Sequence, residues 1–351
     1  MTRKITLAVC LAALSICCGS GKGDNGGDPV NPPNPPNPPQ QPKQIITGYI
    51  PDYTINVSSP GDLSYLQIPD RIYFFGNYPS ETGEWQTRGN IAQRLAIVRV
   101  AMIQGQELFC VAGGGASATP SMHVMGRDPL KREAYATALV NYAHQNQFDG
   151  IDMDWETDWS KSPAVKVRVA DFVDLITLIR TKMNALPSGT RVKKLTTALA
   201  TQSDSRELGN AVKELIDQIN VMVYDVYGSQ AAGYPHAPMD LFTAAMENYV
   251  SAGVPKAKLL GGVPFYGGNK SVSPTQTKTY RELYYAASPA IIASTNSSNN
   301  FAFNGPDLIR EKTRWVVDND YAGMMIWELS QDIPSTSAMS LLRTMKNAIS
   351  E

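Results

Sequence analysis

The stretch that decides the fold of this 351-residue chain runs from Phe148 to Glu156 and is Phe-Asp-Gly-Ile-Asp-Met-Asp-Trp-Glu. On a β-strand successive side chains alternate between the two faces, so Asp152, Asp154 and Glu156 share one face, about 6.6 Å apart per step of two residues. The residues between these acids are apolar and take the other face. Three carboxylates on the inner face of a buried strand are costly without a purpose. The pattern therefore predicts a buried strand that carries chemistry.

Short apolar or β-branched segments recur along the rest of the chain, and several are apolar at every position, as in a parallel sheet buried on both faces. The eight predicted strands are Ile45–Ile50, Arg71–Phe75, Leu108–Ala112, Gly150–Trp155, Leu195–Ala200, Ile219–Tyr224, Leu259–Phe265 and Gly323–Trp327. Amphipathic segments separate them. These predicted helices are Ile91–Met102, Lys131–Gln147, Ala164–Asn184, Glu207–Asp217, Met239–Ala252 and Asp307–Asp318.

The alternation of strand and helix over residues 45–351 predicts an α/β protein with a single (β/α)8 barrel domain. An open doubly wound sheet is the alternative, but no Gly-rich dinucleotide fingerprint follows the first strand. The longest connection, from Tyr266 to Tyr321, has room for some elaboration but not for a large α+β insertion. In a barrel of this kind Glu156 ends its strand at the C-terminal mouth, where barrel enzymes place their chemistry.

Crowded carboxylates repel each other, which raises the pKa of some of them and allows one to act as a general acid near neutral pH. A solvated acidic loop or a divalent-cation site is the alternative. The chain's three histidines, His123, His144 and His236, show no metal-ligand spacing, so we expect no metal and no cofactor. A net charge of −1 gives no general attraction for nucleic acid.

Four acidic residues with the spacing Asp-x-x-Asp-x-Asp-x-Glu, which are Asp149, Asp152, Asp154 and Glu156, resemble the signature of glycoside hydrolase family 18, the chitinase family. Other similar segments fall at barrel positions along the whole predicted domain. They are Gly48–Tyr53, Arg71–Phe75, Ala112–Gly115, Met222–Asp225, Gly262–Gly267 and Gly323–Glu328. The resemblance implies a (β/α)8 barrel and a glycoside hydrolase that cleaves β-1,4-linked N-acetylglucosamine, in chitin or chito-oligosaccharides, by substrate-assisted retaining catalysis.

The resemblance also implies roles for the residues that match. Glu156 would protonate the glycosidic oxygen, while Asp154 and Tyr224 would orient the substrate's acetamido group, whose oxygen attacks the anomeric carbon. Asp152 would exchange a proton or hydrogen bond with Asp154. The implied substrate-binding residues are Asp149 at the strand's entry, Asp225 on a sugar hydroxyl, Trp327 under the −1 sugar, and Tyr49, Phe75 and Met222 in the pocket wall. The last three fit barrel-core packing equally well.

Some residues depart from the family's pattern. Ala112 stands where the family often has serine, so a hydroxyl that could relay polarity to Asp149 or Asp152 is missing, with consequences for the pH optimum. Without a large insertion the groove is expected to be shallow, which favours endo-type cleavage or short oligosaccharides. Three functions remain open: a chitinase, an endo-β-N-acetylglucosaminidase acting on N-glycans, and a chitin-binding lectin. Trp155 favours a chitinase, because the glycan-directed members of the family often have an acidic residue at this position. The retained Glu156 argues against a lectin, because lectins of the family have typically lost this residue.

The N-terminus predicts export. Residues 1–18 combine Arg3 and Lys4 with a 12-residue apolar run and resemble a bacterial lipoprotein signal with Cys17 or Cys18 as the lipidated residue. An ordinary secretory signal is the alternative. Residues 19–44 are rich in Gly, Asn and Pro and predict an extended tether. We expect a monomer whose only link to a cell-envelope membrane is the lipid, on the periplasmic or the cell-surface side.

Overall fold

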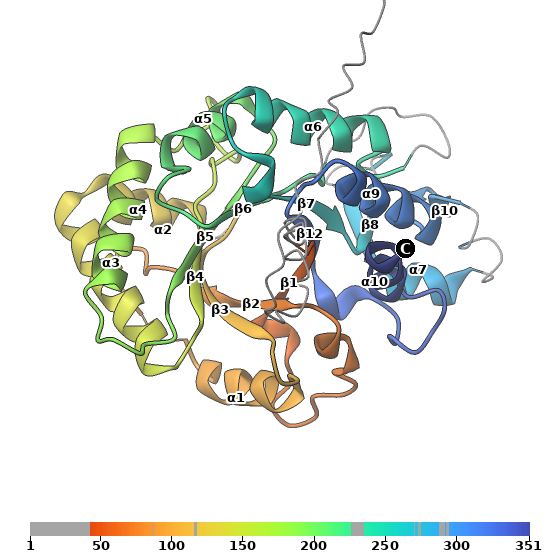
Figure 1. Cartoon of the computed structure of the whole chain (residues 1–351), viewed down its shortest axis with the longest axis horizontal. Helices are drawn as coiled ribbons and strands as arrows, with labels where there is room; N and C mark the ends of the chain where they lie inside the picture. The colour runs from red at the N-terminus through yellow and green to blue at the C-terminus, as the bar shows by residue number, and fades with distance from the viewer. Residues whose placement is uncertain are drawn as a thin grey trace, which may run out of the picture. The chain divides into compact units, whose positions relative to one another are not determined.

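The computed structural model describes residues 43–351, except residues 87, 116–117, 226–234, 270, 273–274, 288–291 and 293–294. The predicted signal peptide and all of the predicted tether before residue 43 therefore lie outside the described residues. Within the described part, eight parallel strands close into a barrel in the order β1-β12-β7-β6-β5-β4-β3-β2, with the helices outside it (Figure 1). The predicted (β/α)8 barrel is thus confirmed.

The barrel strands fall close to the predicted segments. They are β1 (Ile45–Pro51), β2 (Arg71–Asn77), β3 (Glu107–Gly113), β4 (Gly150–Asp154), β5 (Lys194–Leu199), β6 (Gln218–Val221), β7 (Leu259–Pro264) and β12 (Gly323–Trp327). The largest difference is at β6, which ends three residues before the predicted Tyr224. Met222 and Tyr224 therefore lie in the segment that leaves the strand at the barrel mouth, not within the sheet.

The main helices are α1 (Ile91–Ala101), α2 (Thr119–Arg127), α3 (Pro129–Gln145), α4 (Val169–Asn184), α5 (Ser203–Val212), α6 (Met239–Ser251), α9 (Pro306–Asp318) and α10 (Leu341–Ser350). Helices α2 and α10 were not predicted. Helix α3 begins two residues before the prediction because Asp128 caps it, accepting hydrogen bonds from two backbone amides of the first turn. Helix α4 begins later than predicted because Val165 pairs instead with Asp158 in an antiparallel bridge.

The connection from β7 to β12 carries a small four-stranded antiparallel sheet in the order β10-β11-β8-β9. Its strands are β8 (Tyr266–Asn269), β9 (Gln276–Thr279), β10 (Ser297–Ser298) and β11 (Phe301–Ala302). Helix α7 (Tyr280–Ala286) follows β9 and begins with a capping box made by Thr279 and Glu282. The predicted room for elaboration is therefore filled by this sheet, whose strands are too short to have been identified from their sequence pattern.

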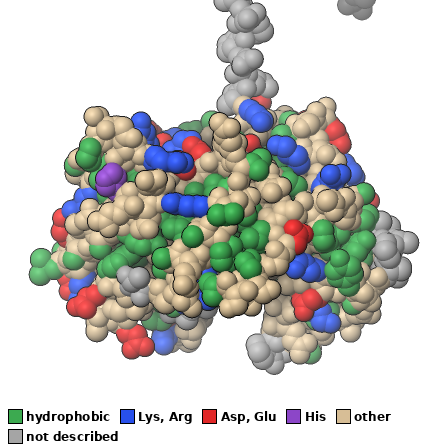
Figure 2. Space-filling view, turned by 90° about the horizontal axis from the view of Figure 1, so that it is seen from below, with side chains coloured by type: hydrophobic (Ala, Val, Ile, Leu, Met, Phe, Trp, Pro, Cys, Tyr) green, Lys and Arg blue, Asp and Glu red, His purple; other side chains and the backbone are tan. Residues whose placement is uncertain are grey.

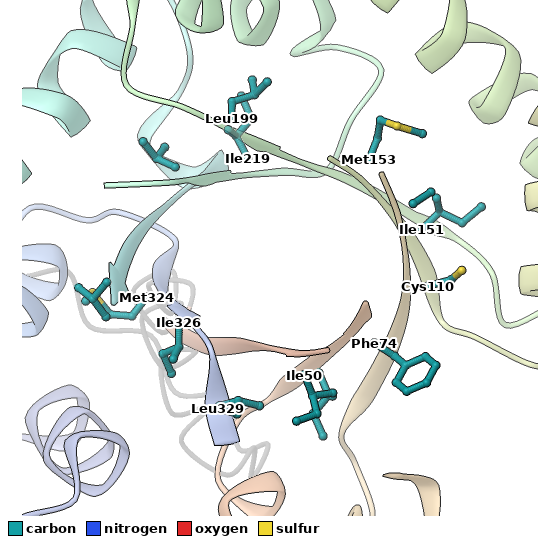
Figure 3. Packing of buried hydrophobic residues seen from close by; sticks show 14 of the residues in the cluster. Ile50, Phe74, Cys110, Ile151, Met153, Leu199, Ile219, Met324, Ile326 and Leu329 are labelled. Atoms are coloured by element: carbon teal, nitrogen blue, oxygen red, sulfur yellow. The ribbon is translucent and has the colours of Figure 1, made fainter. Parts of the chain in front are cut away.

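The apolar core has two shells. The outer shell lies between the strands and the helices, where Ile151 and Met153 of β4 pack with Cys110 of β3 and Phe74 of β2 (Figure 3). The inner shell fills the barrel. It consists of Tyr49, Tyr73, Phe109, Val111, Ala198, Leu260 and Met325. Because successive side chains point to opposite faces of a strand, each barrel strand contributes alternate residues to the inner and the outer shell.

Ala112 belongs to the outer shell, while Val111 lies in the inner shell and is paired in register with Asp152. The expectation that Ala112 removes a hydroxyl near the acidic row is therefore wrong, because its side chain faces the helices. Cys110, buried beside it, has a thiol whose pKa is raised by burial, which disfavours the reactive thiolate.

The surface agrees with the balanced composition of 31 basic and 32 acidic residues. Acidic and basic side chains are interspersed with apolar ones over the face that Figure 2 shows. Across the described part of the chain, none of the helices combines the length and the hydropathy that a membrane span needs.

Candidate active site

Strand β4 carries the acidic row into the barrel. Asp152 is completely buried, Asp154 is 4% exposed, and Glu156 lies two residues beyond the end of the strand with its side chain partly exposed. The predicted alternation is therefore observed, with the acids inside and the apolar residues outside. The row rises from the middle of the barrel to its C-terminal mouth, so that only the last carboxylate is open to solvent.

Asp152 is held by three side chains from three other strands. Its Oδ2 accepts a 2.7 Å hydrogen bond from the Tyr49 hydroxyl, and its Oδ1 accepts bonds from Thr196 (2.5 Å) and Asn220 (3.3 Å). Burial raises the pKa of Asp152 to about 6, against the hydrogen bonds and the charge of Arg71, which lower it. Asp152 is therefore a carboxyl that can change its ionisation state near neutral pH.

A polar chain runs from Asp152 toward the N-terminal end of the barrel. Asn220 accepts from Gln218 (2.9 Å), and Gln218 in turn accepts a 2.5 Å bond from Arg71. Arg71 also donates two bonds to Glu107, at 2.8 and 3.0 Å, and Lys194 donates to the same carboxylate at 2.5 Å. Each of these side chains therefore forms a hydrogen bond with the next one, as buried polar groups inside an apolar barrel require.

The carboxyl group of Asp154 is less fully hydrogen-bonded than that of Asp152. Its Oδ1 has no hydrogen-bond partner among the described residues, although it is buried. Burial, followed by the charges of Glu156 and Asp152, raises the pKa of Asp154 well above its usual value. A buried carboxyl with a raised pKa, and with one oxygen that no described residue contacts by a hydrogen bond, is suited to accept a hydrogen bond from a bound molecule or to share a proton with its neighbours.

Two glycines of β3 and its following loop leave room for these acids. Gly113 has φ +114°, and a Cβ there would come within 1.9 Å of the Asp154 carbonyl oxygen. A Cβ on Gly115 would lie 2.6 Å from Oε1 of Glu156. The Gly114 amide also donates a 2.6 Å hydrogen bond to the Asp154 carbonyl. The glycine run therefore allows the β3 loop to approach the acidic row closely.

Glu156 stands at the mouth as a candidate proton donor. Burial, and then the negative charge of Asp225, raises its pKa to about 7. Asp225 has a left-handed backbone with φ +56°, and its amide donates a 2.7 Å hydrogen bond to Nε2 of His236. The hydroxyl of Tyr266 donates a 2.6 Å bond to the Asp225 carboxylate. These two contacts hold Asp225 in position, and its negative charge acts on Glu156.

Aromatic rings line the barrel beside the acids. The ring centroid of Trp327, at the end of β12, lies 5.6 Å from that of Tyr49 and 5.4 Å from that of Phe75. Met222 and Tyr224 pack against the same inner cluster and, like Trp327, are only partly buried. Burial and the neighbouring acids raise the pKa of Tyr224 well above its usual value, so its hydroxyl stays protonated and can donate. The structure thus brings the sequence-predicted aromatic residues and Met222 together with the acids.

Asp149 does not join this group. It precedes β4 at the N-terminal end of the barrel, where its carboxylate accepts hydrogen bonds from Arg191 (2.9 and 3.0 Å) and from the Leu108 amide (2.8 Å). Its assignment among the substrate-binding residues is therefore wrong, because the length of the strand separates it from the mouth. Its contacts instead agree with support of the strand's entry.

Several polar residues of the site were missed in the sequence. Asn220 lies between the apolar residues Ile219 and Val221 of a predicted strand, so its parity was a signal that could have been used. Thr196 is followed by a second threonine on β5, and Gln218 precedes the predicted strand, so neither showed this signal. His236 lies outside the helices and strands, and Tyr266 begins β8, a strand too short to show a period, so neither contact with Asp225 had such a signal. In the described part of the chain, no group of three or more His, Cys, Asp or Glu side chains is arranged to hold a metal ion.

Comparison with known proteins identifies a family that matches this chain. The protein-family model "Glycosyl hydrolases family 18" matches residues 63–332. Chitinase A1 of Niallia circulans is 27% identical over 263 residues, covering 57% of this chain and 37% of that protein. Chitinase C of Streptomyces lividans is 30% identical over 228 residues, covering 53% and 36%. The chain thus spans a little over a third of the length of these two curated relatives.

Solved structures share the fold. A GH18 chitinase of Flavobacterium johnsoniae is 22% identical, with a TM-score of 0.69 over 88% of this chain and 94% of that one. A chitinase from Bacteroides thetaiotaomicron is 20% identical, with a TM-score of 0.69 over 87% and 96%. At this level of identity the likeness concerns the barrel as a fold.

Proposed function

Because the chain belongs to glycosyl hydrolases family 18, we propose that it is a glycosidase that cleaves β-1,4-linked N-acetylglucosamine in chitin or chito-oligosaccharides. The observation that carries the proposal is the acidic row itself. Glu156 has a pKa of about 7 at the barrel mouth, directly above Asp154, whose buried Oδ1 has no partner among the described residues. The chitinase names of the relatives support the choice of polymer.

In the proposed reaction Glu156 gives its proton to the glycosidic oxygen while the bond between that oxygen and the anomeric carbon breaks. The oxygen of the substrate's own 2-acetamido group forms the new bond to the anomeric carbon and gives a cyclic oxazolinium ion. Asp154 accepts a hydrogen bond from the acetamido N–H, and Tyr224 donates one to the acetamido oxygen, so the attacking atom is held in place. Water then opens the ring, Glu156 takes the water's proton, and the product keeps the β configuration.

The aromatic cluster has a defined part in this proposal. Trp327 forms the floor of the −1 sugar position, with Tyr49 and Phe75 packed against its ring. An indole face offers a large apolar surface to the axial C–H groups of a sugar. Asp225 binds a sugar hydroxyl at the mouth, where its side chain is exposed.

A substrate panel tests the proposal. Chito-oligosaccharides should be cleaved with initial release of the β-anomer, as followed by NMR, whereas cellulose and other glucans, which lack the acetamido group, should not be cleaved. Chitosan should be cut only where an acetylated unit precedes the scissile bond. Initial release of the α-anomer would contradict the mechanism. Cleavage of an N-glycoprotein but not of chito-oligosaccharides would instead identify an endo-β-N-acetylglucosaminidase, and binding of chitin without cleavage would identify a lectin.

We also propose that the protein is exported and anchored by a lipid on Cys17 or Cys18, and acts as a monomer at the cell envelope. The support is the sequence of residues 1–44, with its charged start, apolar run, cysteine pair and Pro-rich segment. Labelling of bacteria with radioactive palmitate should mark the full chain, and either Cys17→Ser or Cys18→Ser should abolish the label. An unlabelled wild-type protein in the culture medium would indicate an ordinary secretory signal.

A further inference from the structure

A completely buried lysine lies outside the barrel, where helix α9 packs against α6 (Figure 1). Lys312 of α9 is 0% exposed, and its Nζ lies 5.1 Å from the ring centroid of Phe242 on α6. In the part of the chain that the structure describes, no carboxylate forms an ion pair with this amine. Glu311, the preceding residue on α9, is the acid whose charge favours its protonated form, but burial lowers the pKa of Lys312 to about 7. A side chain that only filled this space would be apolar, because a buried ammonium group loses its hydration.

The amine of Lys312 holds the segment that precedes α6. Nζ donates a 2.5 Å hydrogen bond to the Ala237 carbonyl and a second bond to Oδ1 of Asn304. The side-chain amide of Asn304, which is also buried, donates to the carbonyl of His236. Two successive carbonyls are thus held from the side of α9. Ala237 has φ +47°, a left-handed conformation that residues with a Cβ rarely adopt, and contacts of this kind are what keep such a conformation in place.

The ring of His236 connects this segment to the barrel mouth. It is completely buried, with its centroid 5.0 Å from that of the Tyr266 ring. Its Nε2 accepts a 2.7 Å hydrogen bond from the Asp225 amide, and the Tyr266 hydroxyl donates to the Asp225 carboxylate. The side chain of Asp225 is 71% exposed, so these contacts, rather than packing, place its carboxylate. A displaced His236 ring would therefore displace the charge that raises the pKa of Glu156.

We propose that Lys312 is a positioning residue that acts on the proton donor Glu156 from outside the barrel. It fixes the backbone of residues 236–237, which fixes the His236 ring and, through it, the carboxylate of Asp225. The inference rests on the proposed function, in which Glu156 is the general acid, and it names a further residue that controls this acid. A lysine amine supplies the two donors that the segment needs whether it is charged or neutral. The alkaline limb of the pH profile therefore reports the ionisation of Glu156 and not that of Lys312.

The test measures the pKa of Glu156 directly, by ¹³C NMR titration of protein with labelled glutamate carboxyl groups, and Glu156→Gln assigns the signal. Lys312→Met fills a similar space but has no donor. We expect it to lower the pKa of Glu156 by about half a unit, which gives an about threefold loss of kcat/KM for chitohexaose on the alkaline limb. Asn304→Ala, which removes the bond to the His236 carbonyl, should act in the same direction. The control Val316→Ala removes buried apolar atoms from the same helix and should leave the pKa unchanged.

A double-mutant cycle separates positioning from a general loss of structure. If Lys312 acts through Asp225, then Lys312→Met lowers the pKa of Glu156 no further in an Asp225→Asn background. An undiminished shift in that background overturns the proposal, and so does a wild-type pKa in Lys312→Met. If Lys312→Met does not fold, Asn304→Ala is subject to the same two criteria.

The same titration keeps this inference distinguishable from the proposed function. If the wild type does not cleave chitohexaose, the proposed function fails, while the pKa of Glu156 still shows whether Lys312 acts on it. If the wild type cleaves chitohexaose and the pKa of Glu156 is the same in Lys312→Met, only the positioning role is overturned. A shift of the same size in Val316→Ala also overturns it, because any disturbance of α9 would then have this effect.

Discussion

The phenolic hydroxyl of Tyr49 on β1 donates a 2.7 Å hydrogen bond to Oδ2 of Asp152 on β4, across the interior of the barrel. The same hydroxyl accepts a 2.9 Å bond from Asn220, which also donates to Asp152. Tyr49 therefore joins the acidic row to the polar chain that leads through Asn220 and Gln218 to Arg71. Burial raises the pKa of Asp152 and this bond lowers it, so the balance near pH 6 depends on Tyr49.

Replacement of Tyr49 by phenylalanine should move the acidic limb of the pH–activity profile to higher pH. The change removes a hydrogen bond that favours the ionised form of Asp152, so its pKa rises above about 6. Since the pair Asp152–Asp154 must keep a negative charge to stabilise the oxazolinium ion, activity is lost at a higher pH. We expect kcat/KM at pH 6 to fall about tenfold, as for a bond to a charged group. An unchanged limb would show that Asp152 does not control it.

Asp225→Asn should move the alkaline limb to lower pH. The negative charge of Asp225 raises the pKa of Glu156, so its removal lowers that pKa from about 7, and the general acid loses its proton sooner as the pH rises. A shift of about one pH unit is expected for a nearby like charge. Tyr266→Phe is the matched control, because it removes the 2.6 Å hydrogen bond to Asp225 but leaves the charge. Equal shifts in the two variants would contradict the electrostatic explanation.

Glu156→Gln should abolish hydrolysis and leave sugar binding largely intact. The amide has the same shape and keeps the space that Gly115 leaves for it, but has no acidic proton to give. Loss of general acid catalysis costs about 10²–10⁴-fold in rate. Steady-state assays measure the loss, and calorimetric titration with chito-oligosaccharide measures the retained affinity. Turnover close to that of the wild type on a sugar leaving group would exclude Glu156 as the acid.

Asp154→Asn should strongly reduce the rate and weaken discrimination for the acetamido group. Asp154 is the acid whose Oδ1 has no partner among the described residues, and an amide cannot balance the positive charge that develops on the acetamido nitrogen. We expect kcat to fall by about 10²-fold or more, as for the removal of one preorganised electrostatic contact. A stable thiazoline analogue should bind the wild type tightly and the variant weakly. Unchanged affinity for the analogue would argue against this role.

Trp327→Ala should weaken oligosaccharide binding more than it destabilises the fold. The indole is only partly buried, although its edge packs against Phe75 and its ring lies near Tyr49. Truncation of a fully buried Trp costs about 3–5 kcal/mol of stability, and a partly exposed ring should cost less. Thermal melts and binding titrations of the same variant decide between the roles. A large loss of stability with unchanged affinity would make Trp327 a core residue.

Much of the barrel could be predicted from the sequence because local patterns carry the information. Alternating side chains on Ile151–Glu156 define an inner and an outer face, and eight apolar segments with helices between them define the closed sheet. The predicted helix ends were wrong where a capping side chain outside the repeating pattern sets the boundary, as Asp128 does at the start of α3. The small sheet β8–β11 was missed since strands of two to four residues have too few positions to show a period.

The sequence by itself determined which carboxylates share a face of β4, because a strand's period of two is a local property of the backbone. Only the tertiary structure decided their environments. Tyr49, Thr196 and Asn220 come from three other strands to donate hydrogen bonds to Asp152, whereas Oδ1 of Asp154 has no partner in the part of the chain that the structure describes. Asp149, of the same motif, pairs with Arg191 at the other end of the barrel. Burial and neighbouring charge set each pKa, and both depend on contacts between residues far apart in the chain.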